Sequence, residues 1–448
     1  MKMKKLLAVA LSAMLMASAA VGFASCNPTN NDPTDTLETR VNRTPDYSYL
    51  KEDLTGKTLK VGTILIGNET EGYTKAHMDG MEAAKKQIEA KGGSVVITHK
   101  KNLVDDNSQC ATELNTLASN GNELVITNSY GHQNWVKPAE GQPLYEKYPN
   151  VTFISMTGDM AAGAGVDNYK NAFTSVYEAR YLSGVVAGYK VKELVENDKL
   201  TAKNYSGGKV KIGYVGAFPF AEVISGYTAF FLGIQSVYPD VTMTVQYTSS
   251  WFDLDGEKAA AQALISDGCV IISQHADSVG APTACEEEYN KGTVVYSVGY
   301  NVSMFDAAPN AALTSATNMW EVYYTYAFYT AMTSANGGKD IVTDWTKAFK
   351  DGAVGLTKIN DDAFTDKTVA TKVAEDAAKL LDGSLKVFDT SKFTVGGETI
   401  TSYTNAFGMN GAECIKTEGG KSWFDESIIR SAPYFDIRID GITELTQE

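Results

Sequence analysis

Four polar residues follow a short apolar run near the middle of the chain. Residues 269–272 read CVII, and Gln274, His275, Asp277 and Ser278 come directly after them. An apolar run of this length indicates a strand buried on both faces. Because alternate side chains of a strand share a side, the imidazole of His275 and the carboxylate of Asp277 are expected to point the same way. Ligands lie at the carboxyl ends of strands in open α/β sheets, so we expect a ligand here.

The same residue types occur in hydrolase triads. Ser278 is poorly placed to act as a nucleophile, since His275 and Asp277 share one side of the strand end while the side chain of Ser278 points away. The chain has no Gly-x-Ser-x-Gly motif, and its four histidines show no helical metal-ligand pairing. We therefore expect a binding protein rather than an enzyme, with no cofactor and no metal.

Aromatic side chains stand in further loops between an expected strand and an expected helix. Tyr73 and Phe218 each precede a helix, and we expect their rings to close on a flat ligand from two sides. Trp251 opens another such loop and is a further stacking candidate. The alternative for each ring is packing against its own helix.

Polar residues complete the expected binding site. Asp253 stands just before a helix, where it either binds the ligand or caps the helix N-terminus. His77 lies inside the first helix, where a buried structural histidine is the alternative to ligand binding. The other candidates follow expected strands and are Ser129, Tyr130 and Asn301.

The elements that would position these residues alternate between strands and helices. An expected strand at 59–66 precedes a helix at 73–90, and a strand at 210–216 precedes a helix at 222–237. This alternation predicts parallel sheets joined by right-handed crossovers. The sequence therefore predicts an α/β fold with two doubly wound lobes joined by a hinge, which close around a ligand.

The repeat also suggests boundaries. We expect the N-terminal lobe to comprise 59–157 and about 302–385, and the C-terminal lobe to comprise 158–301. Residues 386–448 are expected to form a C-terminal extension that returns to the lobes. Within it, 434–439 alternates like a strand.

The composition of the chain limits the classes of partner that it can bind. The chain has 448 residues and a formal net charge of −15, which argues against binding to nucleic acid because that needs a basic face. Beyond Cys26, the cysteine spacing matches neither a zinc site nor a disulfide scaffold, so we expect buried free thiols. These cysteines are Cys110, Cys269, Cys285 and Cys414.

The first 26 residues read as a targeting segment. Lys2, Lys4 and Lys5 precede an apolar stretch that is too short for a membrane span, and the segment ends in Ser25-Cys26. We interpret residues 1–26 as a lipoprotein signal peptide with Cys26 as the lipidated residue; an ordinary signal peptide is the alternative. Residues 27–58 are polar and are expected to be a flexible tether, so that only the lipid anchor contacts the membrane.

Several motifs in this order resemble the basic membrane protein family of ABC-transporter substrate-binding lipoproteins, which includes purine nucleoside receptors. The resemblance covers about 59–332 and, more weakly, 377–388, whereas 389–429 has no counterpart. The motifs are 72–77 (GYTKAH), 177–184 (YEARYLSG), 212–219 (IGYVGAFP), 251–253 (WFD), 274–278 (QHADS) and 299–300 (GY).

The resemblance implies a type I periplasmic-binding-protein fold, a purine nucleoside or nucleobase as ligand, and delivery to a membrane permease by a monomer in the bacterial cell envelope. Asn301 stands where relatives carry an acidic residue that holds ribose hydroxyls, and Tyr73 and Lys75 also depart from the pattern. Two alternatives are a lipoprotein that signals to a membrane receptor and a binding protein for another solute, such as a sugar.

Overall fold

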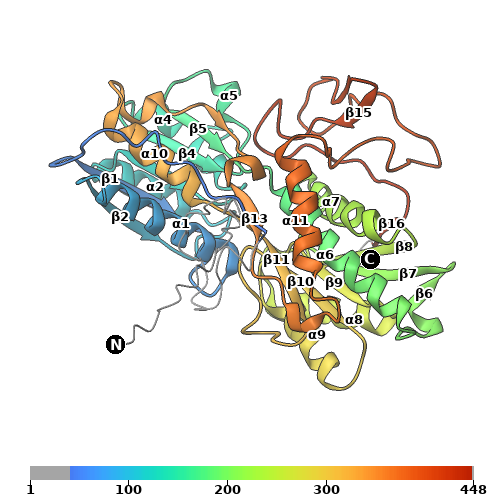
Figure 1. Cartoon of the computed structure of the whole chain (residues 1–448). Helices are drawn as coiled ribbons and strands as arrows, with labels where there is room; N and C mark the ends of the chain where they lie inside the picture. Colours follow the sequence, from blue (N-terminus) through green and yellow to red (C-terminus); the bar gives the residue numbers. More distant parts are fainter. Residues whose placement is uncertain (1–40, 446–448) are drawn as a thin grey trace, which may run out of the picture.

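Two β-sheets, one parallel and one mostly parallel, are each covered by helices and form the two lobes of the protein (Figure 1). The computed structural model describes residues 41–445. The predicted signal segment with Cys26, and residues 27–40 of the predicted tether, lie outside the described residues. Within the described residues, no helix is long and apolar enough to cross a membrane.

The first lobe is built on a sheet with the strand order β12-β5-β4-β3-β1-β2, in which every pairing is parallel. Its strands are β1 (Thr58–Ile64), β2 (Ser94–Lys100), β3 (Leu124–Thr127), β4 (Thr152–Met156), β5 (Tyr169–Ala172) and β12 (Asp344–Trp345). Its helices are α1 (Gly72–Glu89), α2 (Gln109–Ser119), α3 (Gln133–Val136), α4 (Leu144–Lys147), α5 (Ala161–Ala164) and α10 (Glu321–Thr333).

The second lobe has the strand order β13-β11-β10-β9-β7-β8-β16, with β13 antiparallel to β11 at one edge. Its strands are β6 (Tyr205–Ser206), β7 (Lys209–Gly216), β8 (Val241–Tyr247), β9 (Ile271–Gln274), β10 (Tyr296–Tyr300), β11 (Ala312–Asn318), β13 (Val354–Leu356) and β16 (Ile442–Leu445). Its helices are α6 (Val176–Glu196), α7 (Ala221–Val237), α8 (Leu254–Asp267), α9 (Gly280–Asn290) and α11 (Val369–Leu381). Short 3-10 helices are η2 (Ala202–Asn204), η3 (Gly337–Asp340), η4 (Phe349–Asp351) and η5 (Asp361–Ala363).

Local signals explain where several of these elements begin and end. Gly268 ends α8 with a φ of 106°, a left-handed conformation that glycine adopts without a steric penalty. Asp253 caps the other end of α8, since its side chain accepts a hydrogen bond from the Gly256 amide. The apolar faces of these helices cover their sheets as the alternation predicted.

The strand pairing differs from the expected lobe boundaries. β5 lies beyond residue 157 but belongs to the first sheet, whereas β11 and β13 lie beyond residue 301 and belong to the second sheet. β11 is buried along its whole length although it reads ALTSATN, so its burial does not follow from apolar side chains. The chain therefore crosses between the lobes after β5, after β11 and after β12.

The part of the predicted tether that the structure describes is packed rather than extended into solvent. Val41, Leu50 and Leu54 are buried. The Asn42 amide nitrogen donates to the Leu356 carbonyl, and its oxygen accepts from the Leu356 amide, each at 2.9 Å. The expected tether is therefore wrong for residues 41–58, because apolar contacts and an edge-strand hydrogen-bond pair hold this segment.

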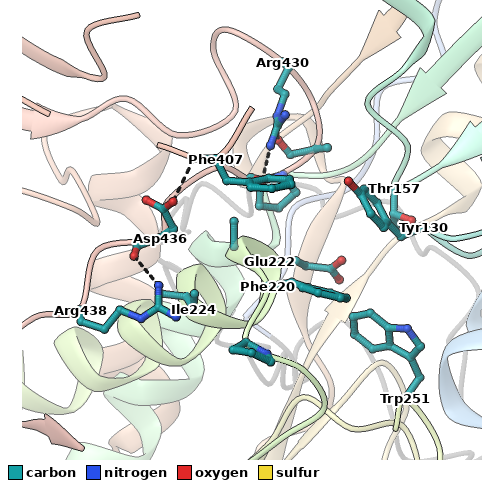
Figure 2. A pocket seen from close by; sticks show the side chains of 14 residues that line it. Tyr130, Thr157, Phe220, Glu222, Ile224, Trp251, Phe407, Arg430, Asp436 and Arg438 are labelled. Carbon is teal, nitrogen blue, oxygen red and sulfur yellow. Dashed lines mark hydrogen bonds between the residues drawn. The ribbon is translucent and has the colours of Figure 1, made fainter. Parts of the chain in front are cut away.

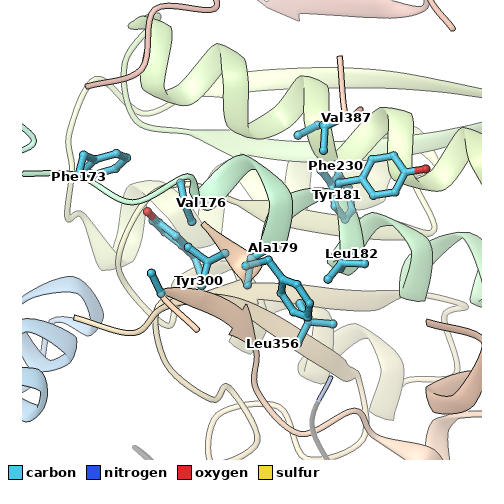
Figure 3. Close-up of a cluster of buried hydrophobic side chains, with 14 of the residues drawn as sticks. Phe173, Val176, Ala179, Tyr181, Leu182, Phe230, Tyr300, Leu356 and Val387 are labelled. Carbon is cyan, nitrogen blue, oxygen red and sulfur yellow. The ribbon is translucent and has the colours of Figure 1, made fainter. Parts of the chain in front are cut away.

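The contact between α6 and α7 depends on glycine. A Cβ placed on Gly184 would lie 2.1 Å from the Phe230 carbonyl oxygen, and one on Gly233 would lie 2.1 Å from the Tyr181 carbonyl oxygen. The two helix backbones can approach this closely only because neither position has a side chain. Figure 3 shows α6 residues such as Val176 and Leu182 in the surrounding apolar cluster.

The C-terminal extension, which the structure describes over residues 386–445, forms a small folded unit beside α7 and α11 and ends in β16 (Figure 1). Its hairpin consists of β14 (Ile415–Glu418) and β15 (Lys421–Phe424). Phe388 stacks on Phe435 with ring centroids 4.2 Å apart. The expected strand at 434–439 is irregular instead; the buried Glu426 carboxylate accepts the Tyr434 and Phe435 amides there, in place of a neighbouring strand.

The described cysteines behave as expected. Cys110, Cys269, Cys285 and Cys414 are buried free thiols. Tyr323, Tyr324 and Phe328 of α10 are buried in the core of the first lobe.

Candidate functional site: the cleft between the lobes

Three adjoining cavities lie between the lobes, and Tyr130 and Trp251 line all of them. The inner pocket, of about 30 Å³, is lined by Tyr73, Ser129, Glu222, His275, Asp277 and Tyr300, among others. The outer chamber, of about 300 Å³, is lined by Thr157, Phe220, Glu222, Phe407, Arg430 and Asp436, among others. The side groove, of about 780 Å³, includes Asn68, Glu71, Phe218 and Phe252.

Asp277 is a buried carboxyl group at the floor of the cleft. The Asn301 amide donates to its Oδ1 atom at 2.9 Å. Burial raises the pKa of Asp277 well above its ordinary value, and the nearby Glu71, Glu257 and Glu222 raise it further. A carboxyl group in this state can accept hydrogen bonds from a ligand, and when protonated it can also donate one.

His275 and Glu222 lie beside Asp277, from β9 and α7. The Nε2 atom of His275 is 3.3 Å from Glu222 Oε1. Burial, together with the positive charge of Arg180, lowers the pKa of His275 to about 4, against the opposing effect of Glu222. His275 is therefore neutral at physiological pH, with a ring nitrogen free to accept.

Arg180 supplies a buried positive charge under the inner pocket. Its Nη1 atom donates to the Gln274 carbonyl at 2.6 Å, and its guanidinium lies 3.6 Å from the centroid of the Tyr300 ring. A buried cation needs compensation, which the tyrosine face and the acidic groups of the cleft provide. Arg180 thereby fixes the end of β9 that carries the polar residues.

Several buried polar atoms around the inner pocket have no hydrogen-bond partner within the described structure. They include Tyr73 Oη, His275 Nδ1, and the Nε and Nη2 atoms of Arg180. Buried polar atoms are almost always paired in folded proteins. Tyr73 and His275 line the inner pocket, so their unpaired atoms indicate a place where a polar ligand or water completes the hydrogen bonding.

Aromatic rings from both lobes line the outer chamber (Figure 2). Tyr130 of the first lobe and Phe220 of the second have ring centroids 6.3 Å apart. Phe220 stacks on Phe218 at 5.2 Å, and Phe218 meets Trp251 edge-on at 5.2 Å. The rings that face each other across the cleft are thus Tyr130 and Phe220.

The expected pair of Tyr73 and Phe218 is not a pair in space. Tyr73 lines the inner pocket, where its ring meets His77 edge-on at 4.4 Å. Phe218 lines the side groove behind Phe220. The loop following β7 turns Phe220 rather than Phe218 toward the first lobe.

The structure brings Tyr73, Ser129, Tyr130, Trp251, His275 and Asp277 to the inner pocket and sets three other candidates apart from the three cavities. His77 is buried, stacks on Trp320 at 4.3 Å, and has its Nδ1 atom 2.6 Å from the Tyr324 hydroxyl. Asp253 is the N-cap of α8. Asn301 lies behind Asp277 with a φ of 63° and orients that carboxyl group.

Sequence reasoning missed Glu222, Phe220, Arg180 and the contribution of the extension. Glu222 and Phe220 follow the strand–loop–helix motif that held Phe218, so the loop was identified but not the side chains that reach the cleft. Arg180 carries the one charge in the 179–188 part of α6, and a charged residue within such a segment was an available signal. Arg430 directly follows the segment 389–429, and no sequence pattern in that region indicated that it borders the cleft.

A ligand-sized cleft between two parallel-sheet lobes, lined by strand ends and loops of both, defines a solute-binding protein of the type I periplasmic-binding-protein fold. A solute-binding protein of an ABC transporter system from Aeropyrum pernix K1 has this fold with a TM-score of 0.57 at 16% identity, over 76% of this chain and 94% of that one.

Comparison with families and relatives gives the class more narrowly. Residues 69–384 match the family model described as ABC transporter substrate-binding protein, PnrA-like. A purine-binding protein of Brucella abortus is 34% identical over 268 residues, which are 59% of this chain and 67% of that protein. A putative ABC transporter glucose-binding protein of Haloferax volcanii is 30% identical over 205 residues, 45% of this chain and 44% of that protein.

The chain belongs to this family of ABC-transporter substrate-binding proteins. Such proteins capture a solute outside the cytoplasm and are not enzymes. The expected family is therefore confirmed, and the match ends at residue 384, just before the C-terminal extension.

Proposed function

We propose that this protein captures a purine nucleoside or nucleobase between its lobes and delivers it to the permease of an ABC importer. The observation that carries the proposal is the cross-cleft pair of Tyr130 and Phe220 in the outer chamber, next to the inner pocket that contains the carboxyl group of Asp277. A purine is flat and carries donors and acceptors on its rim. Aromatic faces beside a few placed polar groups suit such a ligand.

The polar groups of the cleft suit both parts of a nucleoside, the base and the ribose. Asp277 and Glu222 lie at the inner pocket, where carboxylates accept from ribose hydroxyls or from an exocyclic amine. The neutral His275 offers a ring nitrogen beside them. Asn301 takes the place of an acid at this strand end, so we expect nucleobase and nucleoside to bind with comparable affinity.

Calorimetric titration with adenine, adenosine, guanosine, hypoxanthine and ribose tests this function. We expect at least one purine to bind and ribose alone to bind far more weakly, because the aromatic contacts are lost. Mass spectrometry of ligand released from the purified protein provides an independent identification. Binding of ribose or an amino acid with no purine binding would refute the ligand assignment.

A sugar is the second candidate ligand, because the Haloferax volcanii relative carries the name of a glucose-binding protein. Trp251 and Asp277 in one cleft also suit a sugar, which stacks its apolar face on an indole and bonds its hydroxyls to carboxylates. Including glucose in the titration separates the two candidates directly.

We also propose that Cys26 carries the lipid that anchors the protein as a monomer at the outer face of the membrane. Changing Cys26→Ala should release the protein from the membrane fraction. Mass spectrometry that finds an unlipidated wild-type N-terminus would contradict this anchor. The identity of the neighbouring genes, a permease or a membrane kinase, separates transport from the signalling alternative.

A further inference from the structure

The C-terminal extension lies outside the residues that match the family, yet it borders the cleft. The family match ends at residue 384. Phe407, Arg430 and Asp436 of the extension line the outer chamber together with Tyr130 and Phe220 of the two lobes. Figure 2 shows Phe407 at the same space as Tyr130, Phe220 and Trp251. The cleft thus has a wall that neither lobe provides.

The extension holds Phe407 in place through its backbone. The Phe407 amide donates to Asp436 Oδ2 at 2.9 Å, while Asp436 Oδ1 accepts the Tyr403 hydroxyl at 2.9 Å. The next residue, Gly408, has a φ of 72°, and a Cβ there would lie 2.4 Å from Arg430 Nη1. The guanidinium therefore fits under this turn only because residue 408 is glycine.

The ring of Phe407 is not used to stabilise the fold. Its side chain is 58% exposed although its backbone is fixed by Asp436 and by the turn over Arg430. An exposed phenylalanine forgoes most of the favourable free energy of burial. A fixed backbone with an exposed ring at the chamber wall is suited to contact with a bound molecule.

The extension is attached to both lobes. Its C-terminal strand, β16, joins the second sheet, and other residues of the extension contact the first lobe. Arg430 Nη1 lies 3.2 Å from Asp159 Oδ2 of the first lobe, and the Tyr130 hydroxyl donates to the same oxygen at 3.2 Å. The Ser431 amide donates to Asp344 Oδ2 of β12 at 3.0 Å. The Asp159 carboxylate thus contacts both Arg430 of the extension and the hydroxyl of Tyr130, and it holds the two side by side.

We propose that the C-terminal extension forms a third wall of the ligand site, in which the ring of Phe407 contacts the aromatic base of a bound purine. This rests on the proposed function for the class of ligand. The outer chamber takes the base among Tyr130, Phe220 and Phe407, and the inner pocket takes the polar groups of the ligand. Arg430 is a positioning residue, since it holds the turn that carries Phe407.

Calorimetric titration of adenine and adenosine against Phe407 variants tests the third wall. Because base–aromatic stacking contributes roughly 1–3 kcal/mol and about 1.4 kcal/mol changes affinity tenfold, Phe407→Ala should weaken binding by about tenfold. Phe407→Tyr retains the ring and should bind like the wild type. The matched control is Ile428→Ala, which removes another exposed apolar side chain of the extension (69% exposed) that does not line the outer chamber.

The outcomes separate this inference from the proposed function. Purine binding that is equal in the wild type, Phe407→Ala and Ile428→Ala overturns the third wall and leaves the proposed function standing. Equal losses in Phe407→Ala and Ile428→Ala also overturn it, since they show a general effect on the extension. If the wild type binds glucose or ribose and no purine, both the proposed function and the base-contacting role of Phe407 fail.

Discussion

The floor of the cleft gathers more carboxyl groups than it can keep ionised. Asp277, Glu71 and Glu257 are buried, and burial raises the pKa of Glu71 and of Glu257 to about 7. Arg180 is the buried guanidinium near them. Ionising all of these acids together would leave buried charge uncompensated. The inner pocket therefore holds protons near neutral pH, and its stability should depend on pH.

Glu257→Gln tests that dependence. The folded protein holds the Glu257 proton up to about pH 7, against a reference pKa of 4.5, so its contribution to stability is full below about pH 4.5 and is lost as the pH rises toward 7. The nearby Asp253 also raises the pKa of Glu257. Glutamine keeps the acceptor for the Asp253 and Ser278 amides, both of which reach Glu257 Oε1.

Thermal unfolding between pH 5 and pH 8 measures the effect. We expect wild-type stability to fall more steeply than that of Glu257→Gln, by roughly 2 kcal/mol over this range at about 1.4 kcal/mol for each pKa unit. Groups common to both proteins, such as His275, cancel in the comparison. Parallel pH profiles for the two proteins would contradict the raised pKa.

Asp277→Asn should change which ligand is preferred. A carboxyl group offers two equivalent oxygens, whereas an amide has one acceptor oxygen and one donor nitrogen in fixed places, so the pattern that the pocket reads is altered. We expect the ratio of adenosine to guanosine affinity to change by about tenfold, the equivalent of roughly one hydrogen bond. Calorimetry with both nucleosides measures this ratio, and an unchanged ratio would place Asp277 outside the contact surface.

Phe220→Ala removes one ring of the cross-cleft pair. Stacking of roughly 1–3 kcal/mol predicts a loss of purine affinity between about fivefold and a hundredfold. Leu254→Ala is a matched control, since Leu254 is a similarly exposed apolar residue of the second lobe that lies outside the three cavities. If both variants bind as the wild type does, the ring of Phe220 takes no part in stacking.

At the scale of elements, the crossing of α6 and α7 sets the position of Arg180, which lies one turn before Gly184 on α6. A Cβ on Gly184 would lie 2.1 Å from a backbone carbonyl oxygen that cannot move aside alone. Gly184→Ala should therefore destabilise the protein by about 1–3 kcal/mol, the usual cost of overpacking, and lower the unfolding temperature.

Gly163→Ala is the control, because a Cβ there meets nothing within 4 Å and should leave stability nearly unchanged or slightly raised. Denaturant titration measures both, and equal stabilities would contradict the close crossing.

The sequence predicted the strands and helices in which apolar side chains recur at a regular spacing. The strand expected at 210–216 is β7, and the helix expected at 222–237 is α7. β5 and β11 were assigned to the wrong lobes, because short strands of mixed polarity carry no sign of which sheet they join. The polar floor around His275 and Asp277 was predicted from the end of one strand. Phe220 and Phe407 were not, since the orientation of a loop side chain depends on packing between segments far apart in the sequence.

The whole molecule is held closed by contacts that cross between lobes at several places. Thr174 donates to the Asn318 side chain where the chain crosses between the sheets after β5 and after β11. On the other side of the cleft, Tyr130 faces Phe220, and Arg430 reaches Asp159. Hinge opening about the crossing segments must separate the Tyr130–Phe220 pair. The extension joins the second sheet through β16, so opening also changes its distance from Asp159.

Asp159→Asn should therefore shift the protein toward an open form. The side chains of Arg430 and Asp159 are each only 14% exposed, so the loss of the negative charge weakens a shielded ion pair that stabilises the closed arrangement. A ligand that binds the closed form must then supply that free energy, which at about 1 kcal/mol weakens binding roughly fivefold. Small-angle scattering should show a larger radius of gyration for the ligand-free variant than for the ligand-free wild type, and equal values once ligand saturates both. Asp376→Asn, which removes a pair with Lys379 inside α11, is the control and should change neither quantity. Equal dimensions and equal affinities for wild type and Asp159→Asn would mean that the extension moves with the first lobe, so that its contact with Asp159 persists in both forms.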